Sequence, residues 1–384
     1  MESRKTRIGF ISAQIITASI PSAFYKLTTS SNQRDEGLQE ILKNVFDVSE
    51  VSMRRVYYTS LSPLKLYLIL GPLLFLRALE IALKSEIVVA QGYPDLLGVI
   101  ASYVSKKSGK SKIFVIKDTH WYWPSTRVSR VLWPVYLYFI KKADIVIVPG
   151  KASYVFWIRN GIDCSRISIV HYYWLESTMK ECKSIPTRLT KIRERSNALI
   201  LYLGRLIKKR GVDILIRAFD KVRKEQPNAT LIIAGSGPDE GYFKELASNL
   251  GLKNVMFLGP VKEDEKQCLY RIADLFAYVP VKTTIPEEWP IPPLEAIRSG
   301  IIPIVSDIVG SIPDLKPYVI IVPEGDVDAL AQAILKVLRN SEDMRSPRFK
   351  DELIKFANSI NPQVVLREFL YTVKNAIKMR GIRA

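Results

Sequence analysis

The chain has few of the residues from which disulfide frameworks and metal centres are built. Among its 384 residues are only three cysteines and two histidines. Cys164, Cys182 and Cys268 are too few and too scattered for a disulfide framework, and no Cys-x-x-Cys pair offers a metal or redox site. Asp326 and Asp328 follow a glycine and open an amphipathic segment, so they are better explained as helix-capping carboxylates than as metal ligands. We therefore expect no bound metal and a reducing, cytoplasmic setting.

Long apolar runs are also scarce. The longest, from Leu66 to Leu76, covers 11 residues between Lys65 and Arg77. That is about half of the roughly 20 residues that a membrane-spanning helix needs. The first apolar run, around Ile8, is short and indicates a strand. We expect neither a membrane span nor a secretory leader.

Negative charge is in short supply. The 56 Lys and Arg residues exceed the 38 Asp and Glu residues, giving a formal net charge of +18. Residues 1–180 hold 24 basic and 13 acidic residues, a net of +11, and the rest of the chain carries +7. Such a surplus attracts anions: nucleic acid, acidic lipid headgroups or phosphorylated small molecules. Nucleic-acid binding is the weaker hypothesis, because no recognisable nucleic-acid motif is present and the basic residues form no single tract.

What the chain has in abundance is short β-rich runs that alternate with helix-length segments, the pattern of parallel α/β sheets. In the first half, strands are predicted at residues 7–11, 86–90, 112–116, 144–148 and 167–170, with another near 48–56. Helices are predicted at about 34–45, 64–83, 94–107, 128–142 and 150–160.

The polar, charged residues 181–196 interrupt this alternation and are predicted to link two domains. Beyond them, strands are predicted at 198–203, 230–234, 255–258, 275–279, 302–305 and 319–322. Helices are predicted near 212–225, 239–250, 263–272, 293–299 and 326–339. We expect domains at 1–180 and 197–348, and a helical tail at 349–384 that packs back toward the first domain.

Two motifs in the second half could bind a ligand. The loop LGRLIKKRG (203–211) joins a predicted strand to a predicted helix, where free backbone N–H groups and the helix dipole attract a phosphate. The segment EEWPIPPLEA (287–296) places two glutamates eight residues apart, and a carboxylate in the first turn of a helix can accept two vicinal hydroxyls of a ribose. Taken singly, the loop is equally explained as a solvated basic loop, and the glutamate pair is better explained as two surface carboxylates near a helix N-terminus.

Together the motifs resemble family 4 of the glycosyltransferases, which are retaining enzymes of the GT-B fold. The blocks that match, in the family's order over about residues 198–340, are GRLIKKRG, LIIAGSGPDE, NVMFLGPV, ADLFAYV and EEWPIPPLEAIRSG. The resemblance implies an α/β fold in which two Rossmann-like domains face each other across a cleft. It also implies transfer of a sugar from a nucleotide-diphosphate sugar to a glycan or lipid-linked acceptor. Retention at the anomeric carbon is implied too, without a metal or other cofactor.

The resemblance assigns roles to particular residues. Arg205 and Arg210 match the cations that hold the donor diphosphate, and Glu295 matches the glutamate that binds the ribose hydroxyls. Val261 falls where the family's backbone meets the base. The donor-binding residues implied are Gly204, Arg205, Arg210, Val261, Ile291 and Glu295.

The catalytic residues implied are His120 and Glu287, both beside the donor sugar. His120 follows a predicted strand, although a loop histidine among aromatic residues is an alternative. For His171 a structural role is favoured. The family's Gly-Phe-Gly is Glu-Trp-Pro here, and Pro290 has no N–H to offer to a ligand. A non-catalytic sugar-nucleotide-binding protein is therefore a second hypothesis.

Residues 61–84 are unusually apolar for a surface helix and carry Lys65, Arg77 and Lys84. Apolar length with nearby cations is what a helix resting in a membrane interface needs. A buried helix covering the sheet is the alternative. We expect a cytoplasmic protein whose partners are a nucleotide sugar and an acceptor, with peripheral docking on an anionic inner membrane face left open. No nucleic-acid partner is expected.

Overall fold

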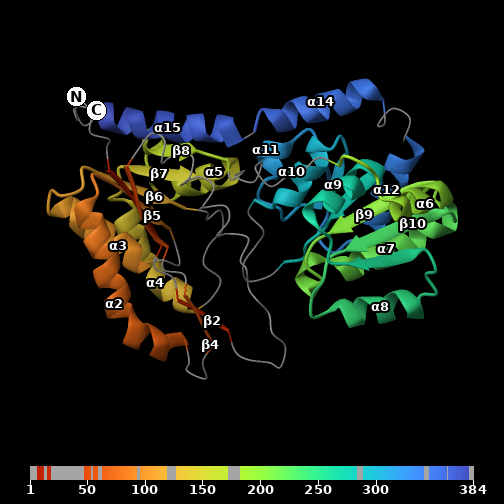
Figure 1. Ribbon diagram of the computed structural model, residues 1–384, viewed down its shortest axis with the longest axis horizontal. Helices are drawn as coiled ribbons and strands as arrows, with labels where there is room; N and C mark the ends of the chain where they lie inside the picture. The colour runs from red at the N-terminus through yellow and green to blue at the C-terminus, as the bar shows by residue number, and fades with distance from the viewer. Residues whose placement is uncertain are drawn as a thin grey trace. The chain divides into compact units, whose positions relative to one another are not determined.

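The computed structural model describes residues 7–12, 15–18, 47–52, 55–58, 63–92, 96–118, 127–171, 182–282, 289–340, 346–360 and 362–379. The chain divides into two compact units (Figure 1). Unit 1 comprises Met1–Leu175 together with Pro362–Ala384, and unit 2 comprises Glu176–Asn361.

The described strands of unit 1 form a parallel sheet in the order β3-β1-β5-β6-β7-β8. Their bounds are β1 (Arg7–Ser12), β3 (Asp47–Ser52), β5 (Ile87–Gln91), β6 (Ile113–Lys117), β7 (Ile145–Val148) and β8 (Ile167–Ile169). The inner strands are near-continuous apolar runs, as in Ile145–Val148, because helices cover parallel sheets on both faces. A separate parallel pair joins β2 (Ile15–Ala18) to β4 (Arg55–Tyr58).

The helices of unit 1 are α2 (Pro63–Lys84), α3 (Leu96–Lys107), α4 (Arg127–Ile140), α5 (Lys151–Arg159) and α15 (Pro362–Met379). Figure 1 shows α15 along one side of the sheet and α2 and α3 along the other. Aromatic side chains fill the core between α4 and α5, where Trp133 stacks on Trp157 with ring centroids 5.6 Å apart. Within the described residues, no helix is both long and apolar enough to cross a bilayer.

Unit 2 holds a second parallel sheet, in the order β11-β10-β9-β12-β13-β14. Its strands are β9 (Ala198–Leu203), β10 (Ala229–Ala234), β11 (Val255–Gly259), β12 (Leu275–Tyr278), β13 (Pro303–Ser306) and β14 (Ile320–Val322). The order reverses between β9 and β12, which are neighbours in the sheet. In open α/β sheets such a reversal marks the carboxyl edge at which ligands bind.

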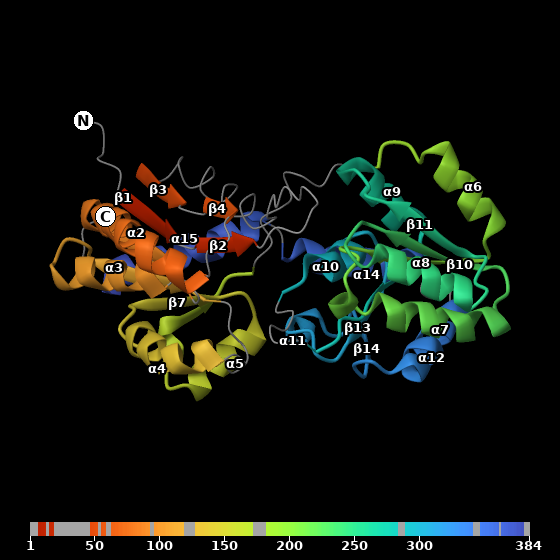
Figure 2. The same ribbon diagram turned by 90° about the horizontal axis from the view of Figure 1, so that it is seen from below.

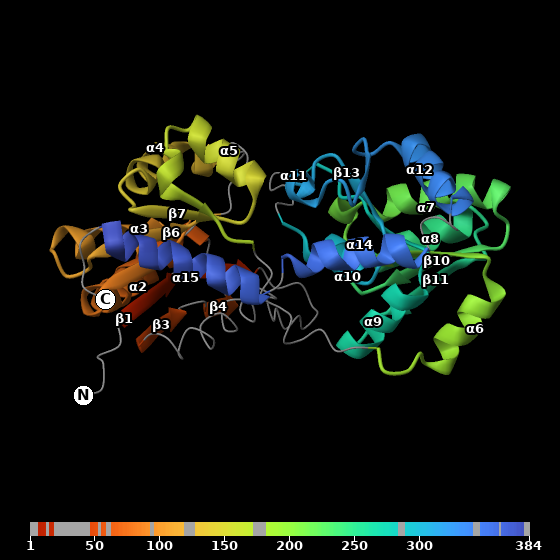
Figure 3. The ribbon, with the colours of Figure 1, turned by 90° about the horizontal axis from the view of Figure 1, so that it is seen from above.

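Helices cover both faces of this sheet (Figures 2 and 3). One face carries α7 (Val212–Glu225), α8 (Glu240–Asn249) and α12 (Val327–Arg339), which share a single apolar core with the strands. The remaining helices are α6 (Thr187–Arg195), which packs on α9 (Glu263–Ile272), α10 (Ile291–Arg298), which packs on α14 (Pro347–Asn358), and the short α11 (Ile312–Leu315). Asp326 caps α12 by accepting a bond from the Ala329 N–H at 2.9 Å, which confirms the capping role predicted for it.

The predicted strands are confirmed, with two differences in unit 1. The strand expected near 48–56 is two strands, β3 and β4, and β2 was not predicted. The helix expected at 34–45 lies outside the described residues. The linker predicted at 181–196 belongs to unit 2 and contains α6, a helix hidden by its polarity because only Leu189 is buried. Of the expected helical tail, α15 belongs to unit 1, whereas α14 belongs to unit 2.

Candidate functional site

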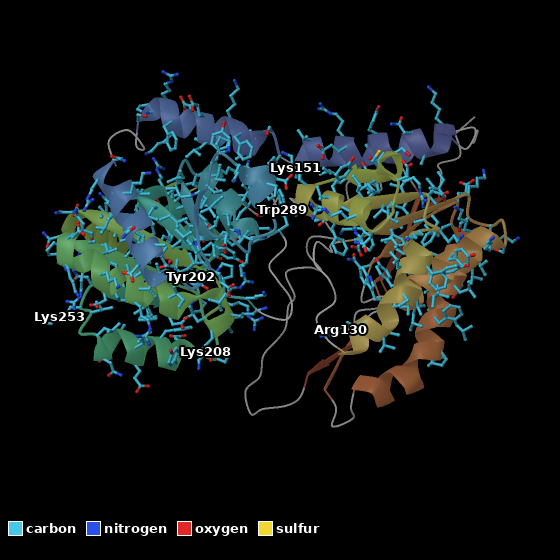
Figure 4. All side chains as sticks on the ribbon, turned by 180° about the vertical axis from the view of Figure 1, so that it is seen from behind. Arg130, Lys151, Tyr202, Lys208, Lys253 and Trp289 are labelled. Carbon is cyan, nitrogen blue, oxygen red and sulfur yellow. A yellow bond between two sulfur atoms is a disulfide. The ribbon has the colours of Figure 1, made fainter. Side chains whose placement is uncertain are left out.

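The loops that leave β9 and β10 are hydrogen-bonded to each other at the carboxyl edge of the unit 2 sheet. The Leu206 N–H donates to the Ser236 carbonyl at 2.9 Å. Beneath the first loop, the hydroxyl of the buried Tyr202 donates to the Arg205 carbonyl at 2.9 Å (Figure 4). The backbone of the predicted phosphate loop is therefore held in place by its neighbours.

Close backbone approach explains the glycines at this edge. A Cβ added to Gly211, whose φ is +67°, would lie 1.8 Å from the Val279 carbonyl oxygen in the loop after β12. One added to Gly235 would lie 1.9 Å from the Gly204 carbonyl oxygen, and the Gly235 N–H donates to the Gly259 carbonyl at 2.8 Å. These contacts bring the four strand-end loops together beside the start of α7, where free N–H groups favour an anion.

The cations of the β9–α7 loop take different positions. Arg205 is exposed. Lys208 is also exposed, with its Nζ 4.5 Å from the ring centroid of Tyr242 on α8 (Figure 4). Arg210 is half-buried, donates a hydrogen bond to the Tyr278 hydroxyl and lies 5.4 Å from that ring. Arg210 is thus attached to the end of β12, while Arg205 and Lys208 face solvent.

Glu295 is a buried carboxylate, with 4% of its surface exposed. Its Oε1 lies 2.6 Å from the Lys266 ammonium, and its Oε2 accepts a bond from the Tyr270 hydroxyl at 3.2 Å. Lys266 also lies 2.7 Å from Glu263. Burial alone lowers the pKa of Lys266, but the negative charges of Glu295 and Glu263 outweigh it and the net shift is upward. The lysine therefore remains protonated at neutral pH.

The sequence around Glu295 fixes its helix. Pro290 lies at the N-cap with φ −67°, and prolines follow in the first turn, where a missing N–H costs nothing. Gly300, at φ +76°, ends the helix. Trp289 and Ile291 are only 6% and 5% exposed, so both anchor the start of α10 in the core. Glu295 consequently stands on a rigid element.

The predicted site residues fall into two groups. Gly204, Arg205 and Arg210 lie in the β9–α7 loop, half-buried Val261 follows β11, and Ile291 and Glu295 lie on α10, so all six belong to unit 2. His120 and Glu287 lie outside the described residues, and their assignments stay predictions. In unit 1, His171 Nδ1 lies 3.7 Å from the Glu368 carboxylate of α15.

Sequence reasoning missed Lys266 and Tyr270, the two partners of Glu295. Both lie on α9, four residues apart and therefore on the same helix face. Their spacing was a usable signal, but α9 carries five charged side chains within its ten residues, EDEKQCLYRI, and none of them matched a motif.

The cysteine expectation needs correction. Cys182 and Cys268 form a disulfide across 86 residues of sequence, and Cys164 is free. The separation hid the pairing, because Cys182 meets α9 only in the folded unit, where the Arg271 guanidinium also donates to the Cys182 carbonyl at 3.2 Å. Disulfides are rare in reducing compartments of mesophiles, so cysteine usage no longer argues for a cytoplasmic setting.

Unit 1 also buries a carboxylate at the carboxyl edge of its sheet. Asp118 directly follows β6 and is fully buried. It accepts hydrogen bonds from the Tyr136 hydroxyl and from Trp157 Nε1, the latter at 2.9 Å. A Cβ added to Gly92 would lie 2.3 Å from an Asp118 oxygen. This cluster fixes the point from which the chain leaves β6 toward His120.

A cavity of about 590 Å³ in unit 1 lies elsewhere. It opens where β7 and β8 begin, and its lining includes Lys106, Lys142, Arg166 and Tyr371 of α15. None of the predicted site residues lines this cavity.

Solved structures with the same fold cover nearly the whole chain. A glycosyltransferase of Rickettsia africae has a TM-score of 0.72 at 16% identity, covering 98% of this chain and 100% of that one. The HepE protein of Anabaena, in complex with UDP and glucose, has a TM-score of 0.69 at 17% identity, covering 96% and 100%. These likenesses confirm the predicted fold class, GT-B with two Rossmann-like units.

The match to a known family lies in the second unit. Residues 190–350 match the family described as glycosyl transferases group 1, which confirms the resemblance inferred from the motifs. An uncharacterized glycosyltransferase of Methanocaldococcus jannaschii is 37% identical over 143 residues, 36% of this chain and 35% of the relative. The GDP-mannose-dependent alpha-(1-6)-phosphatidylinositol monomannoside mannosyltransferase of Mycolicibacterium smegmatis is 32% identical over 161 residues, 39% and 42% respectively. The matches thus span well under half the length of these relatives.

Proposed function

We propose that the chain is a glycosyltransferase that moves a sugar from a nucleotide-diphosphate sugar to an acceptor, with retention of anomeric configuration and without a metal ion. The observation that carries the proposal is the buried, lysine-paired Glu295 at the same sheet edge as a cation-rich strand–helix loop. A carboxylate suits ribose hydroxyls, and the loop suits a diphosphate. The match to group 1 glycosyl transferases over residues 190–350 supports the same assignment.

In this proposal, positive charge from the protein stabilises the departing nucleoside diphosphate. Arg205 and Arg210 and the N-terminus of α7 supply that charge where the phosphates would lie. Glu295 accepts hydrogen bonds from the ribose, and the backbone near Val261 meets the base. His120 and Glu287 orient the hydroxyls of the transferred sugar. Retention and the role of these two residues rest on the family resemblance.

The acceptor proposed is lipid-linked and is met at an anionic membrane surface by unit 1. Large apolar side chains remain exposed on α2 and α4: Leu73 is 61%, Leu76 59% and Val131 75% exposed. Arg77, beside Leu76, keeps 69% of its side chain exposed. Exposed leucines flanked by cations match a bilayer interface, in which apolar side chains enter the acyl boundary and cations meet anionic headgroups. Two relatives bear names of enzymes that act on lipid acceptors, one on a phosphatidylinositol monomannoside and one a monoglucosyldiacylglycerol synthase.

A panel of nucleotide sugars and free nucleoside diphosphates, screened by thermal stabilisation of the protein, tests the donor site without any acceptor. The expected result is stabilisation by one nucleotide class, followed by transfer to a lipid acceptor in a radiolabel assay. Donor binding without transfer or hydrolysis would favour the non-catalytic binder. No nucleotide binding, with strongly salt-dependent binding to duplex DNA, would favour the nucleic-acid hypothesis instead.

A further inference from the structure

The carboxylate of Glu295 is held at both oxygens by one helix. Lys266 lies 2.6 Å from Oε1 and the Tyr270 hydroxyl donates to Oε2 at 3.2 Å, and both residues belong to α9. An ionised carboxylate offers about four lone-pair sites, two on each oxygen. One site on each oxygen is therefore occupied from α9, and among the described residues no side chain other than Lys266 and Tyr270 is recorded as bonding to either oxygen.

The two holding residues are themselves fixed. Tyr270 is fully buried, its ring packs edge-on against Phe276 of β12 at 5.5 Å, and its hydroxyl also lies 3.3 Å from the Pro292 carbonyl oxygen. The side chain of Lys266 is 15% exposed and lies between the carboxylates of Glu295 and Glu263. Neither side chain has room to change its rotamer without losing these contacts.

The helix that carries them is attached to the start of unit 2. The Cys182–Cys268 disulfide joins α9 to the segment before α6, and Arg188 of α6 forms an ion pair with Glu265 of α9. The arrangement therefore sets the direction of the Glu295 carboxylate before any ligand arrives, which is what preorganised recognition requires.

We propose that Lys266 and Tyr270 are positioning residues that turn Glu295 into a two-oxygen acceptor for the vicinal 2′- and 3′-hydroxyls of a ribose, so that the donor site discriminates ribonucleotides from 2′-deoxyribonucleotides. This inference rests on the proposed function. Each hydroxyl donates to a lone pair of one oxygen, while Lys266 and Tyr270 fix the rotation of the carboxylate by holding one oxygen each. Loss of either residue misdirects an acceptor that touches only the ribose.

The alternative is that the Lys266–Glu295 pair only stabilises the packing of α9 on α10. The two accounts predict different values for one ratio, the Kd of the 2′-deoxynucleotide divided by the Kd of the ribonucleotide. A packing defect weakens binding of every nucleotide alike, whereas a misdirected carboxylate weakens ribonucleotides, which lose two contacts, more than 2′-deoxynucleotides, which lose one. Discrimination by one hydrogen bond to a charged acceptor is expected to be roughly tenfold to a hundredfold in Kd.

Calorimetry with UDP, GDP and their 2′-deoxy forms measures this ratio. The wild type is expected to prefer the ribonucleotide of its base, and Glu295→Gln to lose most of that preference. Lys266→Met is expected to reduce the preference to about threefold or less, with deoxynucleotide affinity falling less than ribonucleotide affinity, and Tyr270→Phe to give an intermediate ratio. Lys253→Met is the matched control, because it removes one exposed lysine at the far end of unit 2 from α10 (Figure 4).

The outcomes separate this inference from the proposal on which it rests. If the wild type binds no nucleoside diphosphate, the proposed function fails. If nucleotides bind but Lys266→Met and Tyr270→Phe keep the wild-type ratio, or if the wild type shows no ribose preference, the positioning role is overturned while donor binding stands. Should Lys266→Met fold poorly, judged by its melting temperature, Tyr270→Phe decides the question, because it removes one oxygen atom and leaves the ring in place.

Discussion

Both units bury a carboxylate at the carboxyl edge of a parallel sheet, yet they surround it with different side chains. In unit 1 the partners of Asp118 include the neutral donors Tyr136 and Trp157. In unit 2 the partners of Glu295 are the Tyr270 hydroxyl and, in addition, the ammonium of Lys266. Aromatic donors close over a carboxylate and fix the backbone around it. In unit 2 a cation is paired with the buried carboxylate, and further cations lie in the β9–α7 loop, so the Glu295 site suits a polar ligand.

The loops at the carboxyl ends of the strands also differ between the two units. The strand-end loops of unit 2 are joined by backbone hydrogen bonds and by glycines whose neighbours leave no space for a Cβ, as at Gly211 and Gly235. In unit 1 the Gly92 N–H also donates to the Lys117 carbonyl at 2.7 Å, but the atoms nearest to an added Cβ belong to the side chains of Asp118 and Tyr136. In the proposed function unit 2 recognises the donor, and the chemistry uses His120 of unit 1 together with Glu287 of unit 2.

The largest expected effect tests this division directly. His120→Ala and Glu287→Gln should each lower turnover by roughly 10²–10³-fold, because they remove groups that orient the sugar in the transition state. Affinity for the nucleoside diphosphate, measured by calorimetry, should not change. His171→Ala is the control and should leave turnover intact. A His120 variant with full turnover would mean that unit 1 takes no part in the chemistry.

Removal of the disulfide should distinguish the two units by stability. Cys182→Ser, or reductant, should destabilise unit 2 by about 2–4 kcal/mol, because a cross-link between residues 86 apart restricts the unfolded chain. Differential scanning calorimetry should show a lower transition for one unit only. Cys164→Ser, which removes the free thiol, should change nothing. Identical melting with and without reductant would argue that the bond contributes no stability.

Arg205→Ala should weaken binding of the nucleoside diphosphate by roughly tenfold to a hundredfold, since a charge-assisted contact to phosphate contributes about 1.5–3 kcal/mol. Arg210→Lys should be milder because the charge survives, although the planar fork is lost. The measurement is calorimetry in low salt, with Lys253→Ala as control. If both loop variants bind the nucleoside diphosphate with full affinity, the loop is an ordinary basic surface and does not bind the diphosphate.

The aromatic cluster of unit 1 is tested by Gly92→Ala, which should cost about 1–3 kcal/mol because the new methyl group meets Asp118 at 2.3 Å. Chemical unfolding measures this loss. Gly241→Ala in α8 is the matched control in unit 2, where a Cβ meets nothing within 4 Å and the helix should gain slightly. Equal stability of the two variants would show that the side chains around Asp118 can shift to accommodate the methyl group without a loss of stability.

Much of the fold could be predicted from the sequence because its signals are local. Strands such as Ile145–Val148 are contiguous apolar runs, and the β9–α7 loop and the α10 segment are short motifs. The support of Glu295 could not be predicted, because Lys266 and Tyr270 reach it only when α9 packs on α10. The Cys182–Cys268 bond was hidden for the same reason. Contacts between distant segments have no local pattern, whereas secondary structure and strand-end motifs do.

The smallest expected effect concerns membrane binding by the exposed face of unit 1. The prediction is that side chains of unit 1, and not those of unit 2, bind an anionic membrane. Each Lys or Arg near an anionic bilayer contributes about 1 kcal/mol, so several together give reversible docking.

Co-sedimentation should show salt-sensitive binding to anionic vesicles and little binding to neutral ones. Reversing Lys65 and Arg77 to Glu should abolish it, because both lie on α2 with the exposed Leu73 and Leu76. Lys253→Glu in unit 2 makes one such charge reversal, half of the change in the double variant, at an exposed site and should leave binding nearly intact. If both sets of variants lose binding equally, net charge alone draws the protein to the bilayer, and if the wild type binds neither vesicle, a soluble acceptor becomes the better proposal.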